Sequence, residues 1–511
     1  MTAIPCYYAT KYNNNINEVM SISIPRGGTS QAGVSSHAGF WELFAALLAY
    51  ASVLASGHGV LADQDTYLHI AVGRWIIAHA AIPHVDLFSN SVPGRAWIPH
   101  EWLSEVAVAW IYDHFGWAGL LLTTGLAFAS AIGLLVRWLR RSVEPPYALI
   151  GAALAWALCF PHVLARPHVF AWPLLVAWSA MLIAAREKGR PPPLPLALLM
   201  VFWANMHGSF MFGIALVALL GGEAAYDATS LRMAGAALWR WGLFGALSLA
   251  AAMIGPNGPA ALQLPFLVTG LHFALSYINE WSSPDFQQAQ PIEAWLLLVL
   301  LGILYQGIRL PVTRIAMLLV LVHMTLAHQR HAEILGLVAP LLAAPALAAQ
   351  LPRGAFADAQ LCRRLAERLV PATVMRMALI ASGLLALALS LANLHITRND
   401  DWATPAGALA FIAAHPVAGN VYNDYEYGGY LLFSGIAPFV DGRAEMYGDE
   451  FVMRAGRVQD LPAVLQQYRI AWTLLPVKDA RVTLLDHIAG WRRVYADDMA
   501  VIHLRDEPGE K

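Results

Sequence analysis

Charged residues are scarce in this sequence: Asp, Glu, Lys and Arg make up only 13% of its 511 residues. A soluble globular protein carries about 25%. A larger core does not account for the shortfall, because long uncharged runs occur throughout the first three quarters of the chain. The deficit excludes an ordinary soluble protein. A lipid bilayer is the simplest solvent for such runs, since a helix satisfies its own backbone polar groups there.

Net charge and cysteine are also low, and each shortage removes a class of function. The formal net charge of −2 argues against a nucleic-acid partner. Cys6, Cys159 and Cys362 lie far apart and form no disulfide or metal-binding framework. Residues 1–38 lack the compact charged-then-apolar layout of a signal peptide. Their Asn-rich and Ser/Gly-rich composition predicts a disordered segment.

The sequence is rich in long apolar runs: 58% of its residues are apolar, and its mean hydropathy is +0.52. These runs predict about eleven membrane-spanning helices. They lie at 40–62, 117–136, 147–164, 168–185, 193–206, 209–227, 237–254, 292–308, 312–328, 332–349 and 373–394. The run at 193–206 is short for a bilayer crossing. The expected fold class is a polytopic α-helical membrane protein.

Basic residues predict the orientation of these helices, because cytoplasmic loops collect Lys and Arg. With a cytoplasmic N-terminus, seventeen basic residues fall in cytoplasmic segments. Only Arg74, Arg95, Arg166 and Arg330 fall on the opposite side before the last domain. The predicted domains are a cytoplasmic segment 1–38, a membrane domain 39–394 and a periplasmic domain 395–511. Long outer loops are expected at 63–116 and 255–291, and the membrane is expected to be a bacterial inner membrane.

The region after residue 395 alternates helical and strand patterns. A helix is expected from Thr404-Pro405, and a short strand ends at Val421-Tyr422. Further β-type runs lie at 437–440, 470–475 and 499–504, with amphipathic helical stretches at 461–468 and 480–488. Strands separated by helices favour a small α/β domain with a mostly parallel sheet.

The first outer loop is rich in acids and histidines. It begins Asp63-Gln64-Asp65-Thr66-Tyr67-Leu68-His69 and closes with His100-Glu101-Trp102. A helix would place Asp65 and His69, four residues apart, on one face. Carboxylates and imidazoles near a membrane surface suit proton abstraction or metal coordination. The alternative is an amphipathic interfacial helix whose charges are merely solvated.

Further polar clusters recur at the ends of the predicted helices. They are Arg166-Pro167-His168, Asn205-Met206-His207-Gly208, and His328-Gln329-Arg330-His331 with Glu333; the loop 255–291 adds Glu280. Ionisable residues at such depth are costly if unpaired, so each cluster is a candidate for function. Snorkelling or a structural ion pair is the alternative for each. All of the clusters fall on the predicted outer side, where acids could activate a nucleophile and cations could hold an anion.

Motifs in the outer loops and in the C-terminal region form a set. They are Asp65-x-x-x-His69, Gly73-x-Trp75-Ile76, Pro83-x-x-Asp86-x-Phe88-Ser89, His100-Glu101-Trp102-Leu103, Asn205-x-His207-Gly208, Asn423-Asp424-Tyr425-x-x-Gly428-Gly429-Tyr430 and Asp441-Gly442-Arg443-x-x-x-Tyr447-Gly448. The set resembles a bacterial subgroup of the GT-C-type glycosyltransferases, multi-spanning enzymes that take sugars from polyprenyl-phosphate donors. The protein mannosyltransferases are relatives. The likeness runs from about residue 60 to residue 505.

The resemblance implies a catalytic acid in the first outer loop, close to the membrane. Asp65 is the first choice, Asp63 the rival and Glu101 the third; an ordinary pKa would leave Asp65 ionised at neutral pH. The candidates for binding the donor phosphate are Arg166, His168, His207 and Arg330. Other site candidates are His69, His100, Asn205, Glu280 and His331. Metal use varies across this superfamily, so a divalent metal such as Mg²⁺ or Mn²⁺, held by Asp63, Asp65 and His69, stays an open alternative.

The C-terminal motifs around Gly428-Gly429 and Asp441–Arg443 allow two interpretations. Tyr, Gly and Asp at turns are usually structural, and an Asp–Arg pair commonly ties a loop. Alternatively, this edge of the soluble domain lies over the membrane site and helps to bind the acceptor. Gly428-Gly429 is not a phosphate loop, because no Lys-Ser/Thr follows it.

The function expected from these features is transfer of a sugar from a polyprenyl-phosphate donor to a glycan, lipid or protein acceptor at the outer face of the membrane, with Asp-assisted inversion. A second hypothesis is a transporter or flippase for a lipid-linked saccharide. It predicts internal repeats and charges at mid-span, whereas the sequence shows no repeat between its halves. A third hypothesis is a non-catalytic envelope assembly protein, for which Asp441 and Arg443 matter more than Asp65.

Overall fold

The computed structural model describes residues 39–351, 372–398 and 400–506. The predicted disordered segment 1–38 lies outside the described residues, as do Cys6 and Cys362. Residues from Phe40 onward form one compact unit. The membrane domain and the C-terminal domain are therefore parts of a single packed body.

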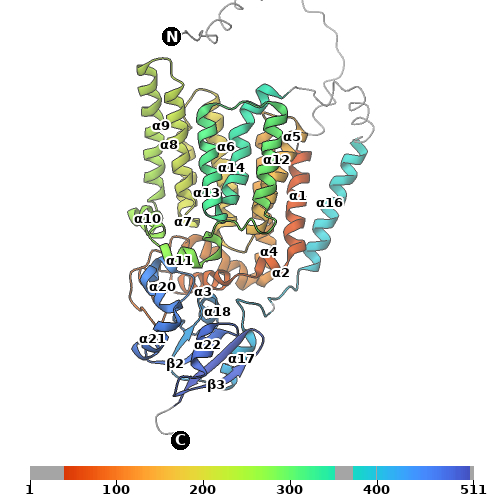
Figure 1. Ribbon diagram of the computed structural model, residues 1–511. Coiled ribbons are helices and arrows are strands. Elements are labelled where there is room, and N and C mark those ends of the chain that lie inside the picture. Colours follow the sequence, from red (N-terminus) through yellow and green to blue (C-terminus); the bar gives the residue numbers. More distant parts are fainter. Residues whose placement is uncertain (1–38, 352–371, 399, 507–511) are drawn as a thin grey trace, which may run out of the picture. The chain divides into compact units, whose positions relative to one another are not determined.

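Helices make up most of the described membrane domain, and the long ones lie side by side in Figure 1. They are α1 (Phe40–Ser56), α2 (His58–Leu61), α3 (Gln64–His79), α4 (Trp102–Leu139), α5 (Pro145–Cys159), α6 (Pro167–Glu187), α7 (Leu198–Met206), α8 (Phe210–Tyr226), α9 (Leu231–Ala252), α10 (Leu264–Thr269), α11 (His272–Tyr277), α12 (Pro291–Gln306), α13 (Val312–Ala327), α14 (Ala332–Gln350) and α16 (Ala372–Ala392). Among the described residues, four helices are long and apolar enough to cross a membrane: Trp102–Leu139, Pro167–Glu187, Gln329–Gln350 and Thr373–Ala392. Five shorter apolar helices accompany them. The polytopic helical fold is confirmed, and the count of eleven spans stays a prediction.

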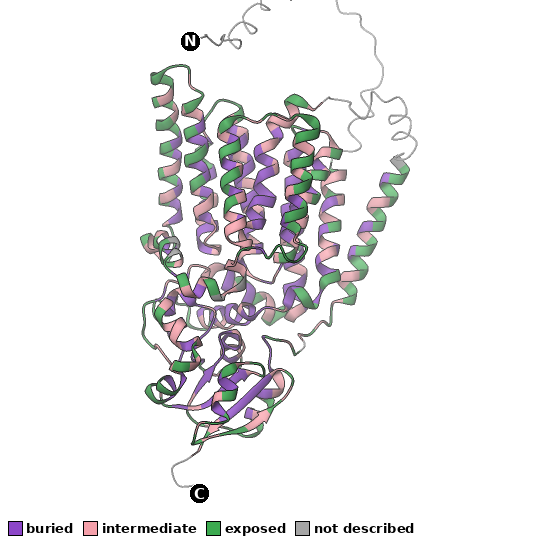
Figure 2. Ribbon diagram, in the orientation of Figure 1, coloured by how far each residue is buried: buried purple, intermediate pink, exposed green. Residues whose placement is uncertain are grey.

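Small residues let these helices approach one another closely. A side chain on Gly125 of α4 would come within 2.9 Å of Tyr50 on α1, and one on Gly213 of α8 within 2.6 Å of Trp203 on α7. Figure 2 shows buried inner faces and exposed outer faces. The outer faces carry large apolar side chains, such as Leu304 of α12. This pattern suits helices that pack on one another through small residues and meet lipid on the outside.

The predicted outer loop 63–116 is largely helical. α3 begins directly after Asp63, whose Oδ1 caps the helix by accepting the N–H groups of Asp65 (2.8 Å) and Thr66 (3.3 Å). Residues 102–115 of α4 pack against α3, close enough that a side chain on Gly73 would collide with the backbone of Glu105. α4 then breaks at Gly116, where φ is 60° and ψ is −154°. Glycine tolerates this conformation, and the membrane helix follows it.

The C-terminal domain is a small sheet covered by helices, as expected. Its strands are β1 (Asn420–Asn423), β2 (Ile470–Pro476), β3 (Trp491–Ala496) and β4 (Ala500–Arg505), in the order β1-β2-β4-β3. Its helices are α17 (Ala406–Ala414), α18 (Gly428–Phe433), α19 (Ala444–Tyr447), α20 (Asp449–Gly456), α21 (Leu461–Gln467) and α22 (Ala480–Leu485). Only β1 and β2 pair in parallel, so the prediction of a mostly parallel sheet is wrong. The sequence pattern does not reveal β3, because Arg492 and Arg493 are exposed on this edge strand.

Residues 437–440 form no strand, contrary to prediction. The carbonyl of Ala437 accepts from the side chain of Asn90 (2.8 Å), and the carbonyl of Phe439 accepts from the hydroxyl of Ser91 (2.6 Å). The Phe439 N–H donates to Asn423 Oδ1 (2.7 Å). The first outer loop thus supplies the partners that a neighbouring strand would supply. Phe439 is nonetheless buried. This burial explains why the apolar run at 437–440 has the sequence pattern of a buried strand.

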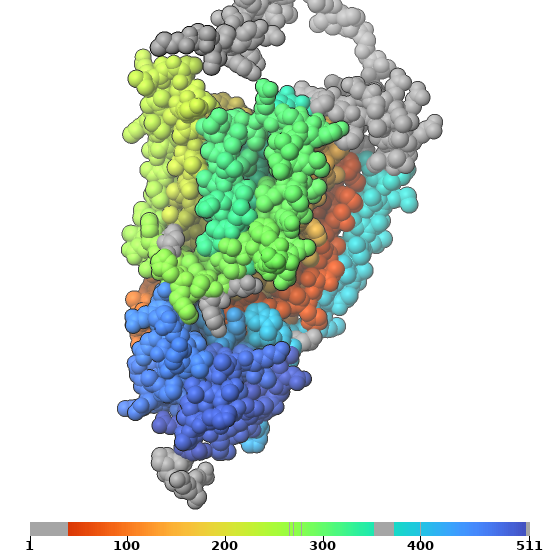
Figure 3. Space-filling model, in the orientation of Figure 1, coloured from red at the N-terminus to blue at the C-terminus, as the bar shows by residue number. Residues whose placement is uncertain are grey.

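The C-terminal domain packs directly on the helices of the outer loops. A side chain on Gly429 of α18 would meet the backbone oxygen of Gln64 in α3 at 2.3 Å. Asp449, at the start of α20, accepts the N–H groups of Phe273 (2.9 Å) and Ala274 (2.7 Å) in α11. Figure 3 shows the blue C-terminal domain against the yellow-green segment that carries α11. One apolar core joins α3, α11 and this domain.

Candidate functional site

Arg166 joins three carboxylates that come from two parts of the chain. Its Nε donates to Asp63 Oδ1 (2.7 Å), its Nη2 to Asp65 Oδ2 (2.5 Å) and its Nη1 to Glu280 Oε1 (2.5 Å). These four residues are called the Arg166 cluster below. Arg166 is the N-cap residue of α6, with φ −123° and ψ 160°. The following Pro167 imposes this extended backbone and starts the helix.

Asp65 is the acid of the cluster with an oxygen to spare. Its Oδ1 is buried and has no hydrogen-bond partner among the described residues. A side chain on Gly442 would come within 2.1 Å of that oxygen, so the C-terminal domain lies directly over it. Burial raises the pKa of Asp65 to about 7, although Arg166 pulls it down. The expectation of an ordinary pKa is therefore wrong, and Asp65 titrates near neutral pH.

A cavity of about 240 Å³ opens beside Glu280. Its polar lining includes His162, His168, Glu280, Gln329, Arg330 and Glu333, and its apolar lining includes Leu158, Leu164 and Ile292. The guanidinium of Arg330 lies over the ring of Trp281, with Cζ 4.4 Å from the ring centroid. None of the described carboxylates forms an ion pair with Arg330. This space is called the Arg330 cavity below.

Glu280 belongs to both the Arg166 cluster and the Arg330 cavity, because it forms an ion pair with Arg166 and also lines the cavity. Burial raises the pKa of Glu280, but Arg166 and Arg330 outweigh burial and hold the pKa well below its ordinary value. Glu280 therefore stays ionised at neutral pH and carries negative charge between the two arginines.

Glu101 lies among three histidines and is not part of the Arg166 cluster. His100 Nε2 and His207 Nε2 are 3.6 Å and 3.5 Å from Glu101 Oε1, and His69 Nε2 is 3.7 Å from Oε2. His69 Nδ1 also lies 3.4 Å from Glu105 Oε1. Burial opposes protonation of His100, but Glu101 raises its pKa to about 9; burial lowers the pKa of His207 to about 3. At neutral pH a charged His100 therefore pairs with Glu101, and His207 is neutral.

The structure gathers most of the predicted site residues but divides them into neighbouring groups. Asp63, Asp65, Arg166 and Glu280 form one group; His69, His100, Glu101 and His207 form the second; His168 and Arg330 line the cavity. The rings of His168 and His207 have centroids 6.1 Å apart, so the cavity and the second group adjoin. The charges of α3 are thus largely buried among partners and not simply solvated.

Asn205 and His331 have structural partners instead. Asn205 Oδ1 accepts the indole N–H of Trp102 (2.7 Å), and its Nδ2 donates to the carbonyl of Ile254 (2.9 Å). These bonds tie the ends of three helices together. His331 Nδ1 lies 3.1 Å from the carbonyl oxygen of Met324, and its ring packs edge-on to Trp281.

Two acids that lie near the site are not among the residues predicted from the sequence. Glu105 contacts His69, and it lies one helical turn after Glu101, which is the spacing that could have revealed it. Glu426 is an unassigned position within the Asn423–Tyr430 motif. Burial, together with the nearby Asp424 and Asp65, raises the pKa of Glu426 to about 8. A single sequence does not show that Glu426 is buried close to Asp65, because the two residues are far apart in the chain.

The predicted metal ligands do not fit a metal ion in this arrangement. Asp63 and Asp65 each direct an oxygen at Arg166, and His69 faces Glu101 and Glu105. Within the described ranges, no group of three or more His, Cys, Asp or Glu residues is arranged to hold a metal. No step below is therefore assigned to a metal.

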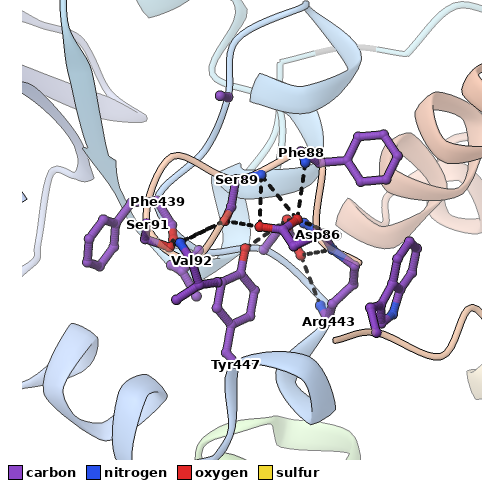
Figure 4. A network of polar contacts seen from close by, with 12 residues as sticks. Asp86, Phe88, Ser89, Ser91, Val92, Phe439, Arg443 and Tyr447 are labelled. Atoms are coloured by element: carbon purple, nitrogen blue, oxygen red, sulfur yellow. Dashed lines mark hydrogen bonds and ion pairs between the residues drawn. The ribbon is translucent and has the colours of Figure 1, made fainter. Parts of the chain in front are cut away.

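The Asp441–Arg443 pair ties a loop, as its structural interpretation expects. Figure 4 shows Arg443 beside Asp86. Its Nη2 donates to Asp441 Oδ2 (2.6 Å), and its Nη1 donates to Asp86 Oδ1 (2.9 Å). Asp86 also accepts the hydroxyl of Ser89, and Asp441 accepts that of Tyr447 (3.1 Å). This network joins the first outer loop to the C-terminal domain.

Comparison with known proteins identifies the fold. No protein-family model and no curated protein matches the sequence. The archaeal oligosaccharyltransferase AglB from Archaeoglobus fulgidus, solved with an inhibitory peptide and a dolichol-phosphate, matches with a TM-score of 0.50 and 12% identity over 93% of this chain and 75% of that one. ArnT from Cupriavidus metallidurans, bound to undecaprenyl phosphate, matches with a TM-score of 0.50 and 14% identity over 90% of this chain and 97% of that one.

Both of these proteins are GT-C-type membrane glycosyltransferases associated with polyprenyl phosphates. At such low identity the likeness shows the fold alone. It covers the membrane helices together with the C-terminal domain, in agreement with the motifs of the outer loops. The chain therefore has the GT-C-type fold.

Proposed function

We propose that the protein is a membrane glycosyltransferase that moves a sugar from a polyprenyl-phosphate donor to an acceptor hydroxyl at the outer face of a bacterial inner membrane. One observation carries the proposal: Glu280 joins the Arg330 cavity to a cluster containing a titratable acid, Asp65. Arg330 forms no ion pair with any carboxylate in the described part of the chain. The fold supports it, since AglB and ArnT were solved with dolichol-phosphate and undecaprenyl phosphate respectively. The acceptor is a glycan, a lipid or a protein.

The Arg330 cavity is proposed to receive the donor phosphate. The ring of Trp281 holds the Arg330 guanidinium in place, and His168 lines the same space. A fixed cation stabilises the charge that grows on the departing phosphate. The prediction that Arg166 and His207 also bind this phosphate stays untested. Their contacts in the structure are to carboxylates: Arg166 to the acids of its cluster, and His207 to Glu101.

Asp65 is proposed as the general base. The acceptor oxygen attacks the anomeric carbon of the donor sugar, and its proton passes to the carboxylate of Asp65. The bond between the anomeric carbon and the phosphate oxygen breaks, and the polyprenyl phosphate leaves with the electron pair. A single displacement inverts the anomeric centre. A pKa of about 7 suits this role, because a base works best when its pKa is close to the working pH.

The proposal is tested with the purified protein in lipid nanodiscs. A panel of undecaprenyl-phosphate-linked monosaccharides carrying a radiolabelled sugar is incubated with glycan, lipid and peptide acceptors. Transfer by the wild type, and its loss in Asp65→Asn, supports the proposal. Full transfer by both Asp65→Asn and Asp63→Asn contradicts it. Saccharide flux across sealed vesicles that persists when these acids are neutralised would favour a transporter instead.

A further inference from the structure

Arg166 commits three of its nitrogens to carboxylates. Nε, Nη1 and Nη2 each donate to a different acid over 2.5–2.7 Å. The acids come from the N-cap of α3, the first turn of α3 and a helical turn at Asn279–Trp281. The arginine side chain is only 14% exposed. The centre of the cluster is therefore a largely buried cation, held by acids from two parts of the chain.

Three carboxylates that converge in this way are the oxygen ligands that Mg²⁺ and Mn²⁺ prefer. In this protein each converging oxygen already faces the guanidinium. Asp63 Oδ1 has two further donors, the N–H groups of Asp65 and Thr66. A metal ion would have to displace a permanently charged side chain that the N-terminus of α6 holds in place.

We infer that the guanidinium of Arg166 takes the place of a divalent metal ion among these carboxylates, so that sugar transfer needs no such ion. This inference rests on the proposed function. A guanidinium is planar and directs its N–H groups at fixed angles, so it orients Asp65 through Oδ2 alone. Asp65 Oδ1 is left without a hydrogen-bond partner among the described residues. Arg166 is thus a positioning residue that acts through Asp65.

Binding of Mn²⁺ tests the inference without any sugar substrate. Wild-type protein, Arg166→Ala and Arg166→Lys are titrated in nanodiscs, and free Mn²⁺ is followed by electron paramagnetic resonance. We expect no stoichiometric binding to the wild type or to Arg166→Lys, which keeps the charge. Arg166→Ala exposes three unpaired carboxylates and should bind one Mn²⁺ at least about tenfold more tightly. Adding Glu280→Gln to that variant should weaken the binding again.

Two outcomes would overturn the inference. One is a Mn²⁺ ion bound by the wild type and lost in Asp65→Asn; the other is an Arg166→Ala variant that folds but binds Mn²⁺ no better than the wild type. Arg330→Ala is the matched control, because it removes a neighbouring arginine that has no carboxylate partner among the described residues. Transfer in the presence of EDTA is the second readout. If no donor yields transfer, the proposed function fails, and the Mn²⁺ titration still decides the role of Arg166.

Discussion

Two buried arginines of this protein hold acids in different ways. Arg443 lies between Asp86 and Asp441, which are 1% and 0% exposed, and hydroxyl groups and backbone N–H groups complete the network. The Arg166 cluster is incomplete by comparison. Asp65 keeps a buried oxygen that has no hydrogen-bond partner in the described part of the chain, and Glu280 borders a cavity.

The difference shows that an Arg–Asp pair does not by itself mark a functional site. A closed network whose members all have partners rigidifies the fold. A buried oxygen without a partner is costly to maintain and is rare in native proteins, so it calls for a ligand or a reaction. By this criterion we propose that the Arg443 network holds the C-terminal domain in place and that the Arg166 cluster carries the chemistry. The four predictions below test that division.

Asp65→Asn should give the largest effect. It removes the base but keeps the shape of the side chain, so kcat should fall by about 10²–10⁴-fold. The thermal unfolding midpoint of the purified protein should hardly change. Transfer assays and thermal melts on the same preparation check both halves. If transfer stays near wild-type level while changes at Asp441 or Arg443 abolish it, the assembly hypothesis gains the stronger support.

Arg443→Met should destabilise the folded protein, whereas Asp65→Asn should not. The change strands Asp86 and Asp441 as buried charges without a cation, which costs about 3–5 kcal/mol. Differential scanning fluorimetry and limited proteolysis of the C-terminal domain measure the loss. Arg492→Met is the matched control, because Arg492 is 57% exposed in its pair with Asp506 and should matter little. Equal stability of the two variants would refute the structural role of Arg443.

Arg330→Gln should weaken donor binding without unfolding the protein. Loss of one charged contact to the phosphate should raise the KM for the donor by about 10- to 100-fold. The KM for the acceptor should not change. Arg74→Gln is the control, since Arg74 pairs with the exposed Asp113 away from the cavity. An unchanged KM for the donor would show that the donor phosphate binds at another site.

The pH profile should give the smallest and most specific effect. Asp65 must be ionised to act, and burial raises its pKa to about 7. Arg166, Asp63, His69 and Glu280 are the charged groups that modify this value. kcat/KM should therefore fall about tenfold per pH unit below 7. The contribution of Asp65 to stability runs the other way: it decreases as pH rises from 3.8 to about 7, because the folded state binds this proton more tightly.

Steady-state rates between pH 5 and pH 9 measure that profile. A profile that stays flat down to pH 5 would show that another carboxylate with an ordinary pKa is the base. Arg443 variants that remain folded should keep the wild-type midpoint, since their network does not contact the base. A shifted midpoint of the pH profile in those variants would contradict the distinction between a structural Arg443 network and a reactive Arg166 cluster.

Much of the fold could be predicted because its signals are local. Long apolar runs mark helices wherever they occur, and Asp63 followed by a helical pattern is an N-cap signal. The partners within the site could not be predicted. Arg166 and Glu280 are 114 positions apart, and Arg443 and Asp86 are 357 apart. A single sequence names candidate residues but holds no record of which ones meet in space.

The sequence also misled where tertiary contacts replaced local ones. Phe439 is buried like a strand residue. Its backbone, however, forms hydrogen bonds with the side chains of Ser91 and Asn423 and not with the backbone of a neighbouring strand. The pKa of Asp65 depends on its burial in the folded site, which depends on the position of Gly442. Environment sets such values, and residue type sets only their starting point.

The placement of Gly442 over Asp65 has a consequence for biosynthesis. The acids at positions 63 and 65 are made early, Arg166 follows about a hundred residues later, and the covering turn comes only in the last domain. In a nascent chain Asp65 can therefore pair with Arg166 early, but its Oδ1 stays uncovered until the turn at Gly442 has been made. The proposed site is therefore complete only once the last domain has been made, and a chain that ends before residue 442 lacks the turn that covers Asp65.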